Sequence, residues 1–202
     1  MRITEMILAV QQELGIDVDG KAGPQTWGAI YERIVNKKVD VQKPLVTIDP
    51  VDSRSEKTIA TLLPEVQPIA RALVQKSSDV GITIKIINGL RTYEEQDALY
   101  AQGRTAPGNI VTNARGGHSN HNFGIAFDIG VFEGNKYLPE SPKYKTVGAL
   151  GIDLGLEWGG NWKTIVDQPH FQLRPMWAIP LTDRQMLTEL RLRHDTNQPV
   201  FV

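Results

Sequence analysis

Hydrophobic residues recur along the chain at helical spacing in some stretches and at strand spacing in others. The helical pattern covers residues 3–14, 24–36, 64–78, 93–103, 141–154 and 182–194, and the strand pattern covers 82–87, 123–131 and 170–173. The predicted helices and strands do not alternate regularly, which argues against a doubly wound parallel sheet. We therefore predict an α+β fold, with a small, mainly antiparallel sheet flanked by helices.

Turn residues and breaks in periodicity divide the chain into four parts. Gly15 ends the first helix, and Pro24 suits the first turn of the second. Sustained periodicity is missing between residues 39 and 56, so this stretch is predicted to be a linker or an extended lead-in. In chain order, we expect a helical module over 1–38, a linker over 39–56, a main domain over 57–180, and a C-terminal helix and tail over 181–202.

Composition and charge exclude several classes of protein. The 202 residues carry 22 Lys and Arg against 23 Asp and Glu, without the basic excess of a nucleic-acid-binding surface. There is no cysteine, so a metal would have to be held by histidine and carboxylate. No apolar run approaches the roughly 18 residues of a membrane span, and the first residues lack the apolar stretch of a secretion signal. Neither membrane insertion nor a signal peptide is expected.

Two segments far apart in the chain carry residues that zinc accepts as ligands. His121 and Asp128 are seven residues apart, and His170 follows about forty residues downstream beside Asp167. On a flat strand an odd separation would send His121 and Asp128 to opposite faces. They can share a metal only if the chain turns between them, and Gly124 is where that turn is expected. A bend at Pro169 would similarly bring Asp167 and His170 to one pocket.

Such a site could hydrolyse an amide bond. Three protein ligands leave a position on zinc for a water molecule, a nearby carboxylate such as Asp167 can move the proton, and Arg91 can face developing negative charge. Each residue also has an ordinary structural interpretation. His121 could be a turn residue, Asp128 could simply end a strand, and Arg91 could be a solvated charge. From spacing alone, zinc is possible and no more.

These residues resemble those of a known family. Ser119-x-His121-x-x-Gly124-x-Ala126-x-Asp128, followed by Asp167-x-x-His170, is similar to the motifs of zinc D-alanyl-D-alanine carboxypeptidases and L-alanyl-D-glutamate endopeptidases (peptidase family M15). Gly89-Leu90-Arg91-Thr92 with Gln96 resembles the upstream motif of that family, although Leu90 replaces its usual aromatic residue. The loop 103–112 and the stretch 157–162 look more like the endopeptidases of phage endolysins.

The resemblance implies a fold, a cofactor and roles for individual residues. The fold would be that of the DD-peptidases and the related Hedgehog-type domains, and the cofactor would be Zn²⁺. The resemblance implies His121, Asp128 and His170 as metal ligands, Asp167 as general base, Arg91 as a catalytic and substrate contact, and Gln96, Ser119 and Trp162 as substrate-binding residues. His118 is expected at the rim of the site rather than on the metal. Trp158 is the better candidate for a core residue, and Trp162 for a wall of the groove.

The first 38 residues resemble a different family. Leu14-Gly15, followed by Asp19-Gly20-Lys21-Ala22-Gly23-Pro24-Gln25-Thr26, is similar to the motif of peptidoglycan-binding modules, although the match is shorter than the usual three-helix module. The resemblance implies wall binding by residues 1–38. The alternative is a helical hairpin that only packs against the main domain.

The sequence thus predicts a monomeric zinc endopeptidase that cuts the L-Ala–D-Glu bond of peptidoglycan stem peptides as a cell-wall lysin. Two alternatives remain: a D-Ala-D-Ala carboxypeptidase, and a non-catalytic, zinc-containing wall-binding protein. Without a signal peptide, the protein is expected to be made in the cytoplasm and released to the wall through a phage holin.

Overall fold

The computed structural model describes residues 3–20, 26, 29–30, 33 and 50–201. The chain divides into two compact units, Met1–Thr47 and Ile48–Val202. The first contains helix α1 (Ile3–Leu14), which begins and ends where the hydrophobic pattern predicts. The side chain of Gln11 is buried there, donating to Asp19 and Thr26 and accepting from the backbone N–H of Gly20. Most of the predicted second helix lies outside the described residues.

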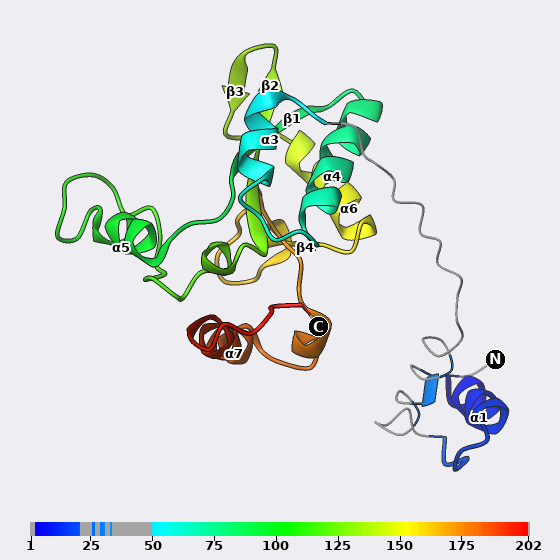
Figure 1. Cartoon of the computed structure of the whole chain (residues 1–202). Coiled ribbons are helices and arrows are strands. Elements are labelled where there is room, and N and C mark those ends of the chain that lie inside the picture. Colours follow the sequence, from blue (N-terminus) through cyan, green and yellow to red (C-terminus); the bar gives the residue numbers. More distant parts are fainter. Residues whose placement is uncertain (1–2, 21–25, 27–28, 31–32, 34–49, 202) are drawn as a thin grey trace. The chain divides into compact units, whose positions relative to one another are not determined.

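The second unit is built on an antiparallel sheet. In chain order, its strands are β1 (Thr83–Asn88), β2 (Ala126–Glu133), β3 (Lys136–Leu138), β4 (Glu157–Trp158) and β5 (His170–Gln172). They pair in the order β1-β2-β5-β4, with β3 also paired to β2 (Figure 1). The predicted α+β class is confirmed. Strands β3 and β4 were not predicted, because three and two residues are too short to establish an alternating pattern.

Three helices cover one face of this sheet: α3 (Ser53–Ile59), α4 (Gln67–Asp79) and α6 (Lys143–Asp153). Figure 1 shows α4 and α6 side by side over the strands. The core between these helices and the sheet is aliphatic and aromatic. It includes Ile59, Leu73, Ile86, Phe127 and Phe171. In α4 the residues Ala70, Leu73 and Ser77 are buried, which is the helical spacing of a single face.

Helix α3 corrects the predicted linker, because residues 53–56 are helical and belong to the second unit. The helix has only seven residues, and its buried positions are Ser55 and Ile59, so it shows no hydrophobic periodicity. Ile59 belongs to the core, and polar contacts also stabilise the helix. Asp52 caps it by accepting from the N–H groups of Arg54 and Ser55, and the Ser55 hydroxyl accepts from Ile86 of β1.

Two other predicted boundaries were wrong for identifiable reasons. Helix α4 begins at Gln67 instead of Pro64, since Pro68 has no N–H with which to continue a helical ladder back to Pro64. Strand β2 begins at Ala126 instead of Phe123, because residues Asn120–Phe123 form the 3₁₀ helix η1. By contrast, α5 (Tyr93–Ala101) begins as predicted, with Thr92 and Glu95 forming a capping box.

The C-terminal helix α7 (Asp183–Asp195) packs against η1 and belongs to the second unit. Its buried residues Met186 and Leu190 form a second apolar cluster with Phe123, Ile125 and Ala178. A helix is thus present where the periodicity over residues 182–194 predicts one. No helix among the described residues is long and apolar enough to cross a membrane.

Helix α6 approaches the sheet closely because two of its buried residues are glycines. A Cβ atom at Gly148 would lie 2.4 Å from the Trp158 ring, and one at Gly151 would lie 2.4 Å from the Phe171 ring. The Trp158 indole cannot simply move away. It is buried, and its Nε1–H donates to the carbonyl of Gln168 in the loop before β5. The spacing between α6 and the sheet therefore constrains that loop as well.

We predict that Gly148→Ala lowers the free energy of unfolding by about 1–3 kcal/mol, the usual cost of overpacking a core. Helix propensity alone would favour alanine by about 1 kcal/mol, so the expected sign is opposite to that of propensity. Chemical denaturation measures the effect. Ala149→Gly is the control. This position is adjacent and exposed, so the variant measures the effect of helix propensity on α6 without a contact to the Trp158 ring. A Gly148→Ala protein as stable as the wild type would contradict the close packing.

Candidate metal centre and active site

The centre of the site is a row of side chains across three neighbouring strands. In the sheet register Asn88 of β1 pairs with Asp128 of β2, and Asp128 pairs with His170 of β5. The register between β1 and β2 shifts between Ile86 and Asn88. Without this bulge, Asn88 would point to the core face with Ile84 and Ile86. With it, the Asn88 amide donates to Asp128 Oδ2 at 3.0 Å.

His121 reaches this row from η1 rather than from a strand. Gly124 ends η1 with φ +67°, and its N–H bonds back to the carbonyl of His121. The predicted turn at Gly124 is confirmed. The Asn122 side chain ties the loop to its surroundings by donating to the Arg91 carbonyl and accepting from the N–H of Gly117. His121 Nδ1 lies 2.8 Å from the Gly89 carbonyl, which only accepts, so Nδ1 carries the proton and Nε2 is left facing Asp128.

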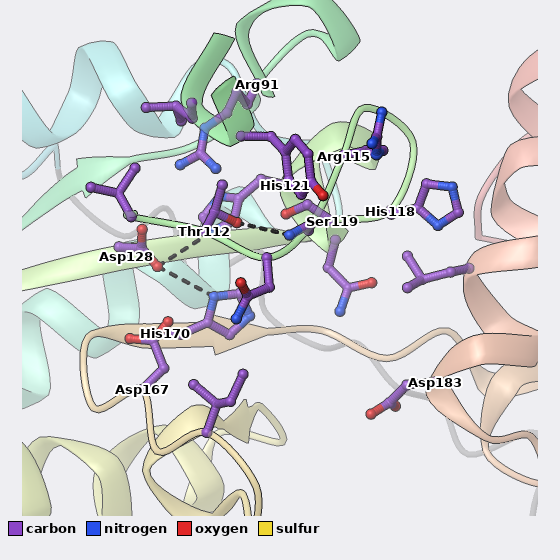
Figure 2. Close-up of a pocket in the computed structure, with 18 of the residues that line it drawn as sticks. Arg91, Thr112, Arg115, His118, Ser119, His121, Asp128, Asp167, His170 and Asp183 are labelled. Carbon is purple, nitrogen blue, oxygen red and sulfur yellow. Dashed lines mark hydrogen bonds and ion pairs between the residues drawn. The ribbon is translucent and has the colours of Figure 1, made fainter. Parts of the chain in front are cut away.

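Three ligand-type atoms converge at the end of this arrangement (Figure 2). Asp128 Oδ1 lies 3.3 Å from His121 Nε2 and 3.3 Å from His170 Nδ1, and all three atoms lie within 4.8 Å of one another. Asp128 Oδ1 is buried, yet it accepts no hydrogen bond from any residue that the structure describes. Ligands about 2.0–2.1 Å from a tetrahedral zinc ion are about 3.3–3.4 Å apart. The spacing, the unpaired oxygen and the N and O donors therefore fit a zinc ion.

At this cluster, burial and the neighbouring ionisable groups shift the pKa values of Asp128 and His170 in opposite directions. Burial raises the pKa of Asp128, but the neighbouring imidazoles of His121 and His170 outweigh it and hold this pKa well below its usual range. Burial lowers the pKa of His170, and contact with the Asp128 carboxylate more than reverses that effect. Without an ion, the two imidazoles favour the Asp128 carboxylate over its neutral acid. A divalent cation would supply the same compensation while binding the unprotonated nitrogens.

Asp167 lies beside this cluster, on the loop before β5 (Figure 2). The loop is held against the chain after β4, where the Asp167 N–H donates to the carbonyl of Gly159 at 3.0 Å. A Cβ atom at Gly159 would lie 2.5 Å from the Asp167 carbonyl oxygen, so only glycine permits this approach. The predicted bend at Pro169 is present, with the His170 N–H bonded to the Asp167 carbonyl. Burial and the nearby Asp128 carboxylate raise the pKa of Asp167.

Arg91 lines the same cleft as the cluster, on the opposite side from Asp167 in Figure 2. One guanidinium N–H donates to the Gln96 side-chain oxygen at 2.7 Å. Gln96 does not line the cleft, which corrects its predicted role as a substrate contact. It is fully buried, and its amide N–H groups are bonded to Thr112 and to the carbonyl of Ala114. Gln96 therefore orients Arg91 instead of contacting a ligand.

The cleft has a volume of about 1020 Å³, and its lining contains every predicted site residue except Gln96: Arg91, Ser119, His121, Asp128, Trp162, Asp167 and His170. The Trp162 ring lies 4.9 Å from the His170 ring and faces the cleft, whereas Trp158 is buried in the core. His118 is exposed at the edge and lies outside the metal-binding group, with Nδ1 3.4 Å from the Arg191 guanidinium. The sequence interpretation of these three residues agrees with their positions.

Asn88 contributes to the site but was not identified from the sequence. Strand parity places it on the core side, and only the bulge reverses its direction. The Asn88-Gly89 pair at the end of the strand was the available signal, because such a pair marks a turn where the regular pattern stops.

Comparisons with known proteins agree with this geometry. A family profile described as D-alanyl-D-alanine carboxypeptidase matches residues 112–173. Over 126 residues the chain is 40% identical to the peptidoglycan L-alanyl-D-glutamate endopeptidase CwlK of Bacillus subtilis, covering 56% of this chain and 74% of that protein. The chain belongs to the M15 peptidase family. The family predicted from the three separated motifs is confirmed.

More distant relatives are also similar to the chain. The L-alanyl-D-glutamate peptidase of Listeria phage A118 is 32% identical over 123 residues, which is 59% of this chain and 41% of the phage protein. Among solved structures, the L-Ala D-Glu endopeptidase ChiX of Serratia marcescens matches with a TM-score of 0.49 and 23% identity. That match covers 63% of this chain and 92% of ChiX.

The importance of the turn at Gly124 can be tested by replacing this glycine with alanine, with Gly134→Ala as the matched control. Gly124 and Gly134 both have positive φ, so alanine at either position should cost about 1–2 kcal/mol. Of these two positions, only Gly124 would bring the new Cβ atom against a neighbour, 3.2 Å from Leu63 Cγ, whereas at Gly134 no atom of the described part of the chain lies within 4 Å. We expect Gly124→Ala to lower the unfolding free energy more than Gly134→Ala does, as measured by urea denaturation. Equal losses would mean that Leu63 does not constrain the turn.

Proposed function

We propose that this protein is a zinc-dependent peptidoglycan endopeptidase that cleaves the L-Ala–D-Glu bond of stem peptides. The observation that carries the proposal is the buried His121–Asp128–His170 cluster, which opens on a cleft that also holds Asp167. The proposal is also supported by the 40% identity between this chain and a protein that is named as a peptidoglycan L-alanyl-D-glutamate endopeptidase. The phage relative carries the same activity in its name and supports action on the cell wall.

The proposed ligand atoms are His121 Nε2, Asp128 Oδ1 and His170 Nδ1. A zinc ion bound there would supply Lewis acidity at the scissile carbonyl and lower the pKa of a water molecule to about 7. The protein contributes the preformed geometry. The Gly89 carbonyl orients His121, and Asn88 holds the second oxygen of Asp128, so neither side chain must reorganise on binding.

Asp167 is proposed as the general base. It lies three residues before His170 and outside the three-ligand cluster, where it can accept a proton from the attacking water and return it to the leaving amine. A base acts only when it is unprotonated. Because burial and Asp128 raise the pKa of Asp167, activity should be lost at a higher pH on acidification than it would be with an ordinary aspartate.

Arg91, Ser119 and Trp162 are proposed as substrate contacts. All three line the cleft, and the Arg91 guanidinium is preorganised by the buried Gln96 side chain. A fixed cation near the reacting carbonyl stabilises the negative charge that develops there, and it can also bind a substrate carboxylate. Trp162 presents an aromatic surface beside His170.

Residues 1–38 are proposed to bind peptidoglycan and so to raise the local concentration of substrate bonds around the catalytic unit. The monomeric state, the absence of nucleic-acid partners and membrane insertion, and release through a holin stay predictions from the sequence.

Mass spectrometry of purified sacculi digested with the protein tests the proposed bond. Cleavage between L-Ala and D-Glu should release peptides with a new D-Glu N-terminus, and removal of zinc with a chelator should abolish their formation. Release of free D-Ala would instead identify a D-Ala-D-Ala carboxypeptidase. Zinc binding without any product would identify a non-catalytic wall-binding protein.

Asp167→Asn is the matched variant for this experiment. It should keep the zinc content of the wild type and lower the cleavage rate by about 10²–10⁴-fold, the usual contribution of a general base. Asp153→Asn makes the same chemical change at an exposed position on α6 and should leave the rate unchanged. Full activity in the Asp167→Asn protein would remove Asp167 from the mechanism.

Deletion of residues 1–38 tests the proposed wall-binding module. The truncated protein should sediment less with purified sacculi but cleave a soluble stem peptide at the rate of the full chain, because the candidate site lies in the unit Ile48–Val202. Sedimentation equal to that of the full chain would make the N-terminal unit a structural appendage.

A further inference from the structure

A second row of polar side chains lies next to the metal-ligand row on the same sheet. Gln172 follows His170 by two residues on β5 and pairs with Ala126 of β2 and Glu157 of β4. Its side chain is almost completely buried. Gln172 Oε1 lies 3.0 Å from His170 Nε2 and accepts from Asn120 Nδ2 at 2.6 Å, while Gln172 Nε2 donates to Glu157 at 2.6 Å. Gln172 therefore connects a proposed zinc ligand to a carboxylate outside the cleft.

The direction of this connection follows from what each group can donate or accept. The Glu157 carboxylate has only acceptors, so the end of the Gln172 amide that faces it must be the NH₂ group. The oxygen of Gln172 then faces His170, and the ring nitrogen opposite it must carry a proton. That proton lies on Nε2. The other nitrogen, Nδ1, is the one that lies 3.3 Å from Asp128 Oδ1.

Glu157 is itself held in place by Arg174. Arg174 Nε donates to Glu157 Oε1, and the other end of the guanidinium donates to Asp183 at the start of α7. One Glu157 oxygen thus accepts from Arg174 and the other from Gln172. An amide in place of this carboxylate would offer a single oxygen, so it could satisfy only one of the two donors.

We propose that Glu157 and Gln172 are positioning residues for the metal site. The Glu157 carboxylate orients the Gln172 amide, and the amide oxygen holds the His170 ring with Nε2–H bonded and Nδ1 directed at the ion. Neither residue lines the cleft, so both act through His170 rather than on substrate. The inference rests on the proposed function for the identity of the ion.

Glu157→Gln tests this inference, because it keeps the size of the side chain and removes one acceptor. The remaining oxygen would accept from the charged Arg174, which forms the stronger bond, so the Gln172 amide would rotate or lose its partner and His170 would lose the acceptor for Nε2–H. Loss of an outer hydrogen bond to a metal-bound histidine typically weakens metal affinity by about 10–100-fold. We expect a rise of that size in the zinc Kd, measured by competition with a chromophoric chelator.

A spectroscopic measurement reports the hydrogen bond directly. In the zinc-loaded wild-type protein labelled with ¹⁵N-histidine, the His170 Nε2–H proton should be protected from exchange with solvent and visible by NMR. In the Glu157→Gln protein this signal should broaden or disappear. Glu189→Gln is the matched control. Glu189 also accepts from an arginine Nε, and its side chain is 35% exposed against 37% for Glu157, but it lies on α7 and outside the cleft.

Exchanging the two groups provides a rescue. The double variant Glu157→Gln with Gln172→Glu places the carboxylate next to His170 and Asn120, with the amide donating to it and offering its oxygen to Arg174. Zinc affinity should return to the wild-type value or exceed it, whereas Gln172→Glu alone sets two carboxylates against each other and should bind zinc more weakly.

The outcomes separate this inference from the proposed function. If the wild type binds zinc, and Glu157→Gln matches both its Kd and its His170 signal, the positioning role is wrong and the proposed function stands. Failure of the exchange to restore affinity would also overturn the positioning role. A wild-type protein that bound no zinc would overturn the proposed function and this inference with it.

Discussion

The register of the antiparallel sheet is the constraint on which the site depends. Asn88, Asp128 and His170 face one another because β1, β2 and β5 are paired at that level, and Gln172 and Glu157 face one another one row further along. A slip of one residue would turn a whole set of side chains to the opposite face. The core on the other face prevents such a slip, since Ile86, Phe127 and Phe171 would have to leave it. Packing on one side thus determines the geometry on the other.

Much of the candidate site, and several of the helices, could be predicted from the sequence. His121, Asp128, Asp167 and His170 could be identified because their types suit zinc, and because parity showed that the chain must turn at Gly124 before His121 and Asp128 could meet. The resemblance to a family then supplied their order and roles. Helices with long apolar faces, such as α1, α4 and α7, were recognisable from periodicity alone.

The features that escaped prediction are those determined by tertiary contacts. The bulge that redirects Asn88 exists only in the pairing of β1 with β2. Helix α3 buries a serine whose hydroxyl bonds to another element, so no apolar pattern indicates it. Gln96 appeared in a substrate motif, but its burial and its bond to Arg91 depend on the packing of α5 against the loop at Thr112 and Ala114.

The ligand-type atoms of the cluster come from three separate elements of the folded unit: one from the 3₁₀ helix η1, one from the central strand β2 and one from the late strand β5. An unfolded chain cannot bring these three together, so an ion held by all of them binds the native state almost exclusively. Its binding free energy then adds to the stability of the whole sheet, by RT ln(1 + [ion]/Kd). For a protein with this architecture, the free concentration of the ion would set resistance to unfolding as well as catalytic competence.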